Sequence, residues 1–240
     1  MRAATCIRTQ HALSGAILRF FLASAEDFPD QDIAALTSIG GSANGRLPSF
    51  LLSSPRSLTR MTRLLTGSAL APMLQEADFS SLPEGLLLLP GTQLRELAVH
   101  AGLALHCRTV AARVDRRDVR ALRAAFGDAA HQFAVLRAPF FLRDPEGLAD
   151  ALGAKAEEQS PIEELVSRVK LAGLACLSTC ALALPLALGT LFGRKLTALS
   201  SWGIAPSAAF LEDEQKYSLH ALLEKILRKE LEPKWNPSCS

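Results

Sequence analysis

The stretch LAGLACLSTCALALPLALGTLFG, residues 171–193, has no charged residue over 23 positions. As one continuous helix it would be about 34 Å long, enough to cross a hydrocarbon core of about 30 Å. A helix that is apolar on all sides suits either a bilayer or the centre of a large protein fold. This segment must therefore span a membrane or be buried by the rest of the chain.

The details of this run favour burial. Pro185 would break a single helix two-thirds of the way along it. Basic residues flank both ends, so the run has no bias of positive charge toward one side. These flanking residues are Arg168, Lys170, Arg194 and Lys195. We predict two packed helices that meet near Pro185, and a single transmembrane helix over 171–193 is the alternative.

The composition predicts a mainly all-α fold: a compact multi-helix globule with little or no sheet. Ala, Leu, Arg and Glu dominate the 240 residues, whereas Tyr occurs once. A Gly- and Ser-rich stretch at 39–48 indicates a linker. We therefore expect an N-terminal helical segment with its linker over 1–45 and a single helical domain over 46–240.

Periodicity and capping residues place the helices of the central region. A long, deeply buried helix is expected over 92–114, with Thr92 as its cap. A second helix should start at Asp118, break at Gly127 and resume with Asp128 as cap.

Two further helices are expected in the C-terminal half. Ser160-Pro161-Ile162-Glu163 combines a capping serine, proline at the first helical position and a capping-box glutamate. An amphipathic helix should end the chain before Pro233. Its apolar stripe is Leu219, Leu222, Leu223, Ile226 and Leu227.

The sequence contains no common nucleotide-binding, metalloprotease or hydrolase motif. The best candidate metal ligands are His100, His106 and Cys107, but the two histidines are about 120° apart around one helix. Cys176 and Cys180 share a helix face, where they could form a redox pair or serve as small core residues. We interpret all five as structural, and we expect no metal site, no cofactor and no catalytic residue.

The clearest surface feature is a cluster of arginines. From Arg95 to Arg143, nine arginines and four acidic residues give a net charge of +5, whereas the whole chain carries only +2. Helical spacing would place the first four arginines of the cluster on one continuous face. We consider three interpretations: a solvated face, a docking site for an acidic protein partner, and a nucleic-acid site. The lack of interleaved aromatic residues weighs against nucleic acid. The candidate partner-binding surface is Arg113, Arg116, Arg117, Arg120 and Arg123.

Three stretches together resemble a known family. These are LPSFLLSSPRSLTRMTRLLTG, the central stretch LLLLPGTQLRELAVHAGLALHCRTVAARVDRRDVRALRAAFGDAAHQFAVLRAP and the upstream AILRFFLASAEDFPD. They are similar to the SctK family (also called YscK or PscK) of bacterial type III secretion proteins. The match covers 47–139 best, and the C-terminal half follows the family by arrangement. The matching positions in the centre are Leu94, Leu97, Gly102, His106, Asp115, Arg116, Val119, Leu122, Arg123, Gly127, Phe133, Ala134, Arg137, Ala138 and Pro139.

The resemblance implies a function. Members of this family are small, mainly helical, non-enzymatic cytoplasmic subunits of the sorting platform beneath the injectisome. They link the scaffold protein of the cytoplasmic pods to the cytoplasmic domain of the inner-membrane ring protein, and they carry no cofactor. We therefore expect an adaptor at the cytoplasmic face of the inner membrane, which contacts the membrane only through its partners. A single-span inner-membrane protein and a small metal or redox protein are the alternatives.

The N-terminal sequence is consistent with a cytoplasmic location. Arg19 lies inside AILRFFLA, the one candidate for the apolar core of a signal peptide. A charge at this point leaves no uninterrupted run of the usual length. We expect a short amphipathic helix here, and no signal peptide.

Overall fold

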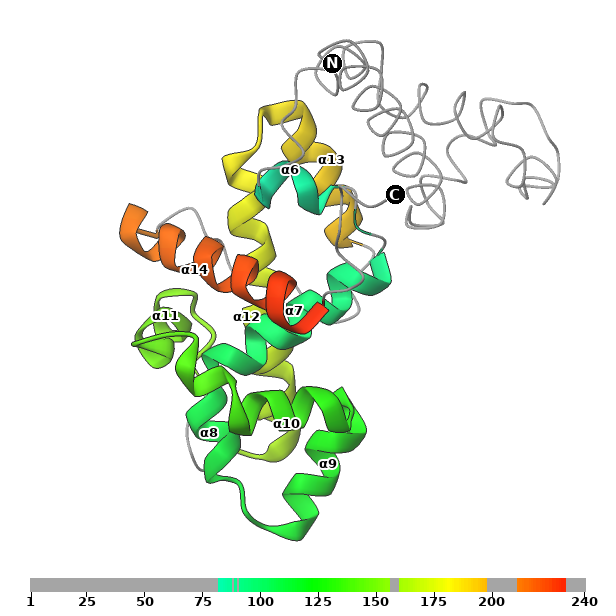
Figure 1. The fold of residues 1–240 in the computed structure, drawn as a ribbon, viewed down its shortest axis with the longest axis vertical. Helices are drawn as coiled ribbons and strands as arrows, with labels where there is room; N and C mark the ends of the chain where they lie inside the picture. Colours follow the sequence, from blue (N-terminus) through cyan, green and yellow to red (C-terminus); the bar gives the residue numbers. More distant parts are fainter. Residues whose placement is uncertain (1–81, 88, 90, 156–159, 198–210, 232–240) are drawn as a thin grey trace, which may run out of the picture. The chain divides into compact units, whose positions relative to one another are not determined.

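A computed structural model describes residues 82–87, 89, 91–155, 160–197 and 211–231. These residues form helices and contain no strand, which confirms the predicted all-α class (Figure 1). The helices are α6 (Leu82–Leu86), α7 (Gly91–Leu105), α8 (Cys107–Ala112), α9 (Arg116–Phe126), α10 (Asp128–Leu136), the 3₁₀ turn η1 (Ala138–Phe140), α11 (Pro145–Ala151), α12 (Ile162–Ala183), α13 (Leu186–Thr197), α14 (Asp213–Ile226) and the π-helical turn η4 (Leu227–Leu231).

The chain divides into two compact units. The larger contains residues 92–183 and 199–235, and the other contains residues 1–91, 184–198 and 236–240. The predicted boundary between 1–45 and 46–240, with the N-terminal helix and its linker, lies outside the described residues and stays a prediction.

The larger unit is organised around a close crossing of α7 and α12. Gly102 of α7 lies against the backbone carbonyl of Val169, and a Cβ at this position would overlap the carbonyl oxygen. Gly173 of α12 lies in the same way against the carbonyl of Ala98. Each helix therefore contributes one glycine, and the two backbones touch with no side chain between them.

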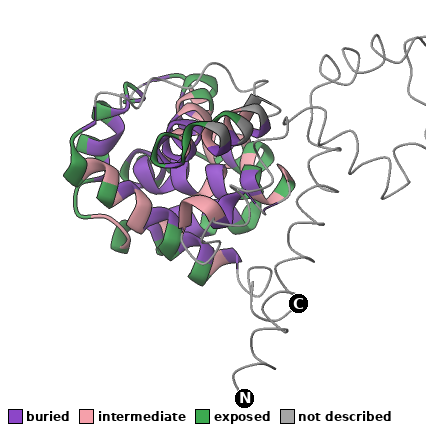
Figure 2. Ribbon diagram, turned by 90° about the horizontal axis from the view of Figure 1, so that it is seen from above, coloured by how far each residue is buried: buried purple, intermediate pink, exposed green. Residues whose placement is uncertain are grey.

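Both crossing helices are largely buried, as predicted. In α7, buried residues occupy every position from Ala101 to Leu105. In α12, the six consecutive residues from Ala172 to Leu177 are buried, so the helix is covered on all sides there. Figure 2 shows the same distribution for the described helices in general, with buried segments inside and exposed ones on the outer faces.

The uncharged run is two helices, as predicted. Helix α12 ends at Ala183, α13 begins at Leu186, and Pro185 lies between them. Proline has no N–H to continue the helical bonding and clashes with the preceding turn, which accounts for the break at this point. The alternative, one continuous helix over 171–193, is therefore wrong.

In the smaller unit, α13 carries a buried cation. Lys195 is 2% exposed. Its Nζ donates hydrogen bonds to the carbonyl oxygens of Leu87 at 2.8 Å and Leu89 at 3.0 Å. Through these hydrogen bonds, Lys195 connects α13 to the segment that follows α6.

Several predicted helix ends are wrong by a few residues. The helix expected over 92–114 starts at Gly91, breaks at His106 and ends at Ala112. The next helix starts before Asp118, because the side chain of Asp115 accepts a hydrogen bond from the backbone N–H of Arg117 at 2.6 Å and caps it there.

The predicted starts of the following helices are also shifted. Gly127 breaks the chain as expected, with φ of +90°, and takes the cap position that was assigned to Asp128. The helix expected from Ser160 begins at Ile162, where the N–H of Leu165 donates to the carbonyl of Pro161. Ser160, the expected cap, is buried and lies two residues before the helix.

The C-terminal helix follows its predicted pattern. All five residues of the expected stripe are at most 2% exposed, and α12 contacts α14. Helix α14 continues into η4, which ends at Leu231, before Pro233 as expected. Arg137 and Glu230 form an ion pair at 2.6 Å that joins the residue after α10 to this turn.

The glycine crossing gives the first prediction. Gly102→Ala should lower the free energy of unfolding by about 2 kcal/mol, because overlap with a backbone carbonyl forces the two helices apart. The higher helix propensity of alanine offsets at most about 1 kcal/mol of the loss. Urea unfolding followed by circular dichroism measures the change.

Gly193→Ala is the matched control, because Gly193 is also inside a helix but has open space around it. It should leave stability unchanged or raise it by up to about 1 kcal/mol. Equal effects of the two substitutions would contradict the role of Gly102 in the crossing.

Candidate functional site

The five arginines of the predicted surface do not lie on one helix. Arg116, Arg117, Arg120 and Arg123 belong to α9, but Arg113 follows α8 in a non-helical conformation, with φ of −81° and ψ of 89°. The prediction of one continuous face from residue 113 is therefore wrong. Its cause is the cap at Asp115, which begins a new helix with a new direction.

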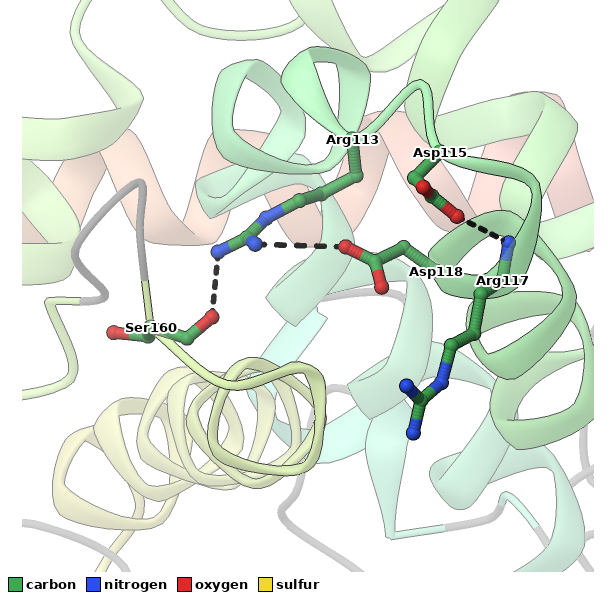
Figure 3. A network of polar contacts seen from close by, with 5 residues as sticks. All are labelled: Arg113, Asp115, Arg117, Asp118 and Ser160. Carbon is green, nitrogen blue, oxygen red and sulfur yellow. Dashed lines mark hydrogen bonds and ion pairs between the residues drawn. The ribbon is translucent and has the colours of Figure 1, made fainter.

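Arg113 is largely buried and makes contacts within the protein. Its side chain is 15% exposed and forms an ion pair with Asp118 at 3.5 Å. It also donates a hydrogen bond to the backbone carbonyl of Ser160 at 2.7 Å. Figure 3 shows Arg113 between these two groups, with the Asp115 cap beside them. Arg113 thus connects the start of α9 to the segment before α12.

The remaining arginines form the exposed surface. Arg116, Arg117 and Arg120 are exposed, and none of them forms an ion pair within the described part of the chain. Arg123 is also exposed and lies 3.5 Å from Asp128, where solvent weakens the attraction. We call Arg116, Arg117, Arg120 and Arg123 the basic face of α9. The opposite side of the helix packs through Leu122, which is fully buried.

The candidate metal ligands lie in different surroundings. The Nδ1 of His100 donates to the carbonyl of Glu96 at 2.8 Å, and its ring packs against Phe133 of α10 at 5.0 Å. His106 is 3% exposed, and burial, helped by the charge of Arg168, lowers its pKa to about 4. Across the described ranges, no group of three or more His, Cys, Asp or Glu residues is placed to hold a metal ion.

The cysteines of the described region are buried thiols. Cys107 is 1% exposed, and burial raises its pKa. Burial also raises the pKa of Cys176, and it raises the pKa of Cys180 to about 12. A thiol with a raised pKa stays protonated at neutral pH, and the thiolate is the reactive form. Cys176 and Cys180 are core residues of α12, as the packing interpretation predicted.

A second surface feature lies along α14, and the sequence analysis missed it. The segment from Phe141 to Leu148 and one side of α14 line a groove of about 630 Å³. On α14 the lining residues follow helical spacing: Glu214, Tyr217, Ser218, Ala221 and Lys225. The sequence does show part of this feature: Tyr217, Ser218 and Ala221 are uncharged, although they lie among charged residues on the solvent side of the helix.

One described helix, α12, is long and apolar enough to cross a membrane by length and composition. Its mean hydropathy is 1.5 over the most apolar window, and 56% of that window is buried inside the protein. A core helix and a membrane span both meet this criterion.

Comparison with protein families gives the decisive match. The model of the family described as "YOP proteins translocation protein K (YscK)" matches residues 45–240. The chain belongs to the YscK family. It is therefore a type III secretion protein, a component of a bacterial secretion system, and its family is not a known family of enzymes. No curated protein and no solved structure matches the chain.

The family match agrees with the resemblance found in the sequence. The matched residues, 45–240, include the stretch 47–139 that the resemblance covers best. Several of the motif positions have structural roles in this protein. Gly102 lies at the helix crossing, Gly127 adopts a positive φ, and Arg137 pairs with Glu230.

The Arg113 contacts give a second prediction. Arg113→Ala should lower the free energy of unfolding by about 1.5–3 kcal/mol, the usual contribution of hydrogen bonds to a charged group. Arg117→Ala, which removes an exposed guanidinium, should change it by less than about 0.5 kcal/mol. Denaturant unfolding of the two variants compares them directly. A loss for Arg117→Ala as large as for Arg113→Ala would contradict this assignment.

The buried His106 gives a third prediction, on pH dependence. Its pKa of about 4 in the folded protein lies below the usual 6.5, so the unfolded chain binds the proton more readily. Stability is therefore retained above pH 6.5 and is lost as the pH falls from 6.5 toward 4. Between pH 7 and pH 5 this histidine accounts for a loss of about 2 kcal/mol.

The measurement is the unfolding free energy at both pH values for the wild type and His106→Leu. The other histidines titrate in both proteins, so the difference between the two pH dependences isolates His106. The wild type should lose about 2 kcal/mol more than the variant on acidification. Identical pH dependences would show that His106 is protonated equally well in the folded state.

Proposed function

We propose that the protein is a non-enzymatic adaptor of the type III secretion sorting platform. In this role it links the scaffold protein of the cytoplasmic pods to the cytoplasmic domain of the inner-membrane ring protein. It would act at the cytoplasmic face of the inner membrane and associate with the membrane through its partners. Membership of the YscK family supports this reading, as does the burial of the thiols and of His106.

The observation that carries the proposal is the basic face of α9. Three of its guanidinium groups are exposed and have no ion pair within the described ranges. Guanidinium groups bind carboxylates through paired hydrogen bonds, so this face suits an acidic protein surface. Helix α9 has 11 residues and is about 16 Å long.

Nucleic acid fits this face less well than protein. Asp115 and Asp128 flank the arginines at the two ends of α9, so the face lacks the extended stripe of positive charge that follows a phosphate backbone. The exposed side of α9 also has no aromatic residue on which a base could stack.

A fourth prediction tests the basic face with purified full-length protein. Arg116→Glu combined with Arg120→Glu should weaken binding to the acidic partner, the pod scaffold or the ring domain, by about tenfold or more, because it opposes like charges. Lys155→Glu is the control: it reverses an exposed charge in the loop after α11 and should leave binding unchanged. Calorimetry at two salt concentrations measures both the affinity and its electrostatic part.

Two results would count against this proposal. Unchanged binding of both partners to the doubly reversed variant would exclude the basic face as a docking site. Failure of the wild type to bind either subunit would exclude the adaptor role. Alkaline extraction of bacterial membranes tests the location separately: an adaptor is released into the supernatant, whereas an integral protein stays in the bilayer.

A further inference from the structure

The groove along α14 is a second surface with a distinct chemistry. The middle of its α14 side is formed by two small side chains, Ser218 and Ala221, which are weakly polar and partly exposed. Leu148 and Leu222 provide buried apolar side chains in the lining, and Phe141 lies on the wall opposite α14. Tyr217, on the α14 side, is 75% exposed, a large aromatic side chain with little cover.

Along α14, the two ends of the groove carry opposite charges, whereas Arg143 and Asp144 on the other wall balance each other. Glu212 and Glu214 lie at the start of α14, and both are exposed. Lys225 lies three turns further on, about 16 Å along the helix axis from Glu214. Its Nζ donates to the carbonyl of Phe141 at 3.1 Å, so this charge is fixed at that end. Lys229 lies 5.8 Å from the ring of Phe141 and strengthens the positive end.

This distribution of charge selects a particular occupant. Helices tend to have acidic residues in the first turn and basic residues in the last, because these charges complement the helix dipole. A helix that lies antiparallel to α14 would place its basic end beside Glu212 and Glu214, and its acidic start beside Lys225. A parallel helix would oppose like charges at both ends.

We propose that this groove binds an amphipathic helix of a partner protein, about three to four turns long and antiparallel to α14. Its apolar side chains enter between Tyr217 and Phe141, over Ser218 and Ala221. Its charges pair with Glu214 at one end and Lys225 at the other. Such helix-in-groove binding relies on anchors at helical spacing, and the spacing of the lining residues on α14 provides the matching surface.

The start of α14 is not available to an anionic ligand. The side chain of Gln215 accepts a hydrogen bond from the N–H of Glu212 at 3.0 Å, and the Glu212 side chain accepts from a backbone N–H in return. This capping box, together with Glu214, already supplies the negative groups that a helix start attracts. A cationic side chain is therefore the expected neighbour at this end.

The test uses two synthetic 14-residue peptides with the same apolar stripe. The forward peptide has Glu in its first turn and Lys in its last, and the mirrored peptide has these charges exchanged. Both are chemically stapled to equal helicity, which is checked by circular dichroism. Fluorescence anisotropy with the full-length protein at low salt should show saturable binding, and the forward peptide should bind about tenfold tighter.

Two variants locate the binding. Ala221→Trp fills the centre of the groove and should weaken forward-peptide binding at least tenfold. Ala125→Trp is its control, because Ala125 is an exposed helical alanine on α9. The exchange Glu214→Lys with Lys225→Glu should reverse the preference, so that the mirrored peptide binds more tightly. Circular dichroism and thermal unfolding check that each variant is folded.

Several results would overturn the inference. They are the absence of saturable binding, equal affinity for the two peptides, and wild-type affinity in a folded Ala221→Trp variant. A wild-type dimer in sedimentation that Ala221→Trp dissociates would identify a second copy of this chain as the occupant and also overturn it. The basic face of α9 does not enter these experiments, so their failure leaves the adaptor proposal to its own test.

Discussion

The contact on which the larger unit depends is the crossing of α7 and α12 at two glycines. Gly102 and Gly173 each lie against a carbonyl of the other helix, so the distance between the helix axes is set by backbone atoms. Side chains can repack when a helix shifts, but two backbones in contact have no such freedom. The crossing therefore gives this unit a fixed centre. Around it, the fully buried residues Ala98, Ala101 and Ala172 are all small. Larger side chains at these positions would separate the helices.

The charged residues near α9 divide into structural and exposed groups. Arg113 uses its charge internally, between Asp118 and the carbonyl of Ser160, and so ties the start of α9 to the segment before α12. Asp118 is thereby occupied by Arg113 and does not neutralise its exposed neighbours. As a result the basic face of α9 keeps its positive charge toward solvent. One pair inside the fold thus determines how much charge remains on the surface.

The sequence was sufficient for features that depend on local chemistry. Pro185 must interrupt a helix wherever it packs, and the Leu219–Leu227 stripe has one apolar side whatever its partner. The break at His106 could not be predicted, because residues 103–113 contain no Gly or Pro and the local pattern continues. Its position depends on what surrounds a buried histidine in three dimensions. For the groove, the sequence shows only the α14 side, at Tyr217, Ser218 and Ala221. The other wall comes from residues 141–148, about 70 positions before α14 in the sequence.

The apolar helix that first suggested a membrane span has a mechanical role in this reading. Helix α12 contacts both α9, which carries the basic face, and α14, which lines the groove. The adaptor role proposed above requires that the two surfaces keep a fixed distance from each other. A helix buried on all sides in its middle, and held against α7 by glycine contacts, meets this requirement better than a loosely packed amphipathic one. The hydrophobicity of α12 is thus explained by its burial against α7, α9 and α14.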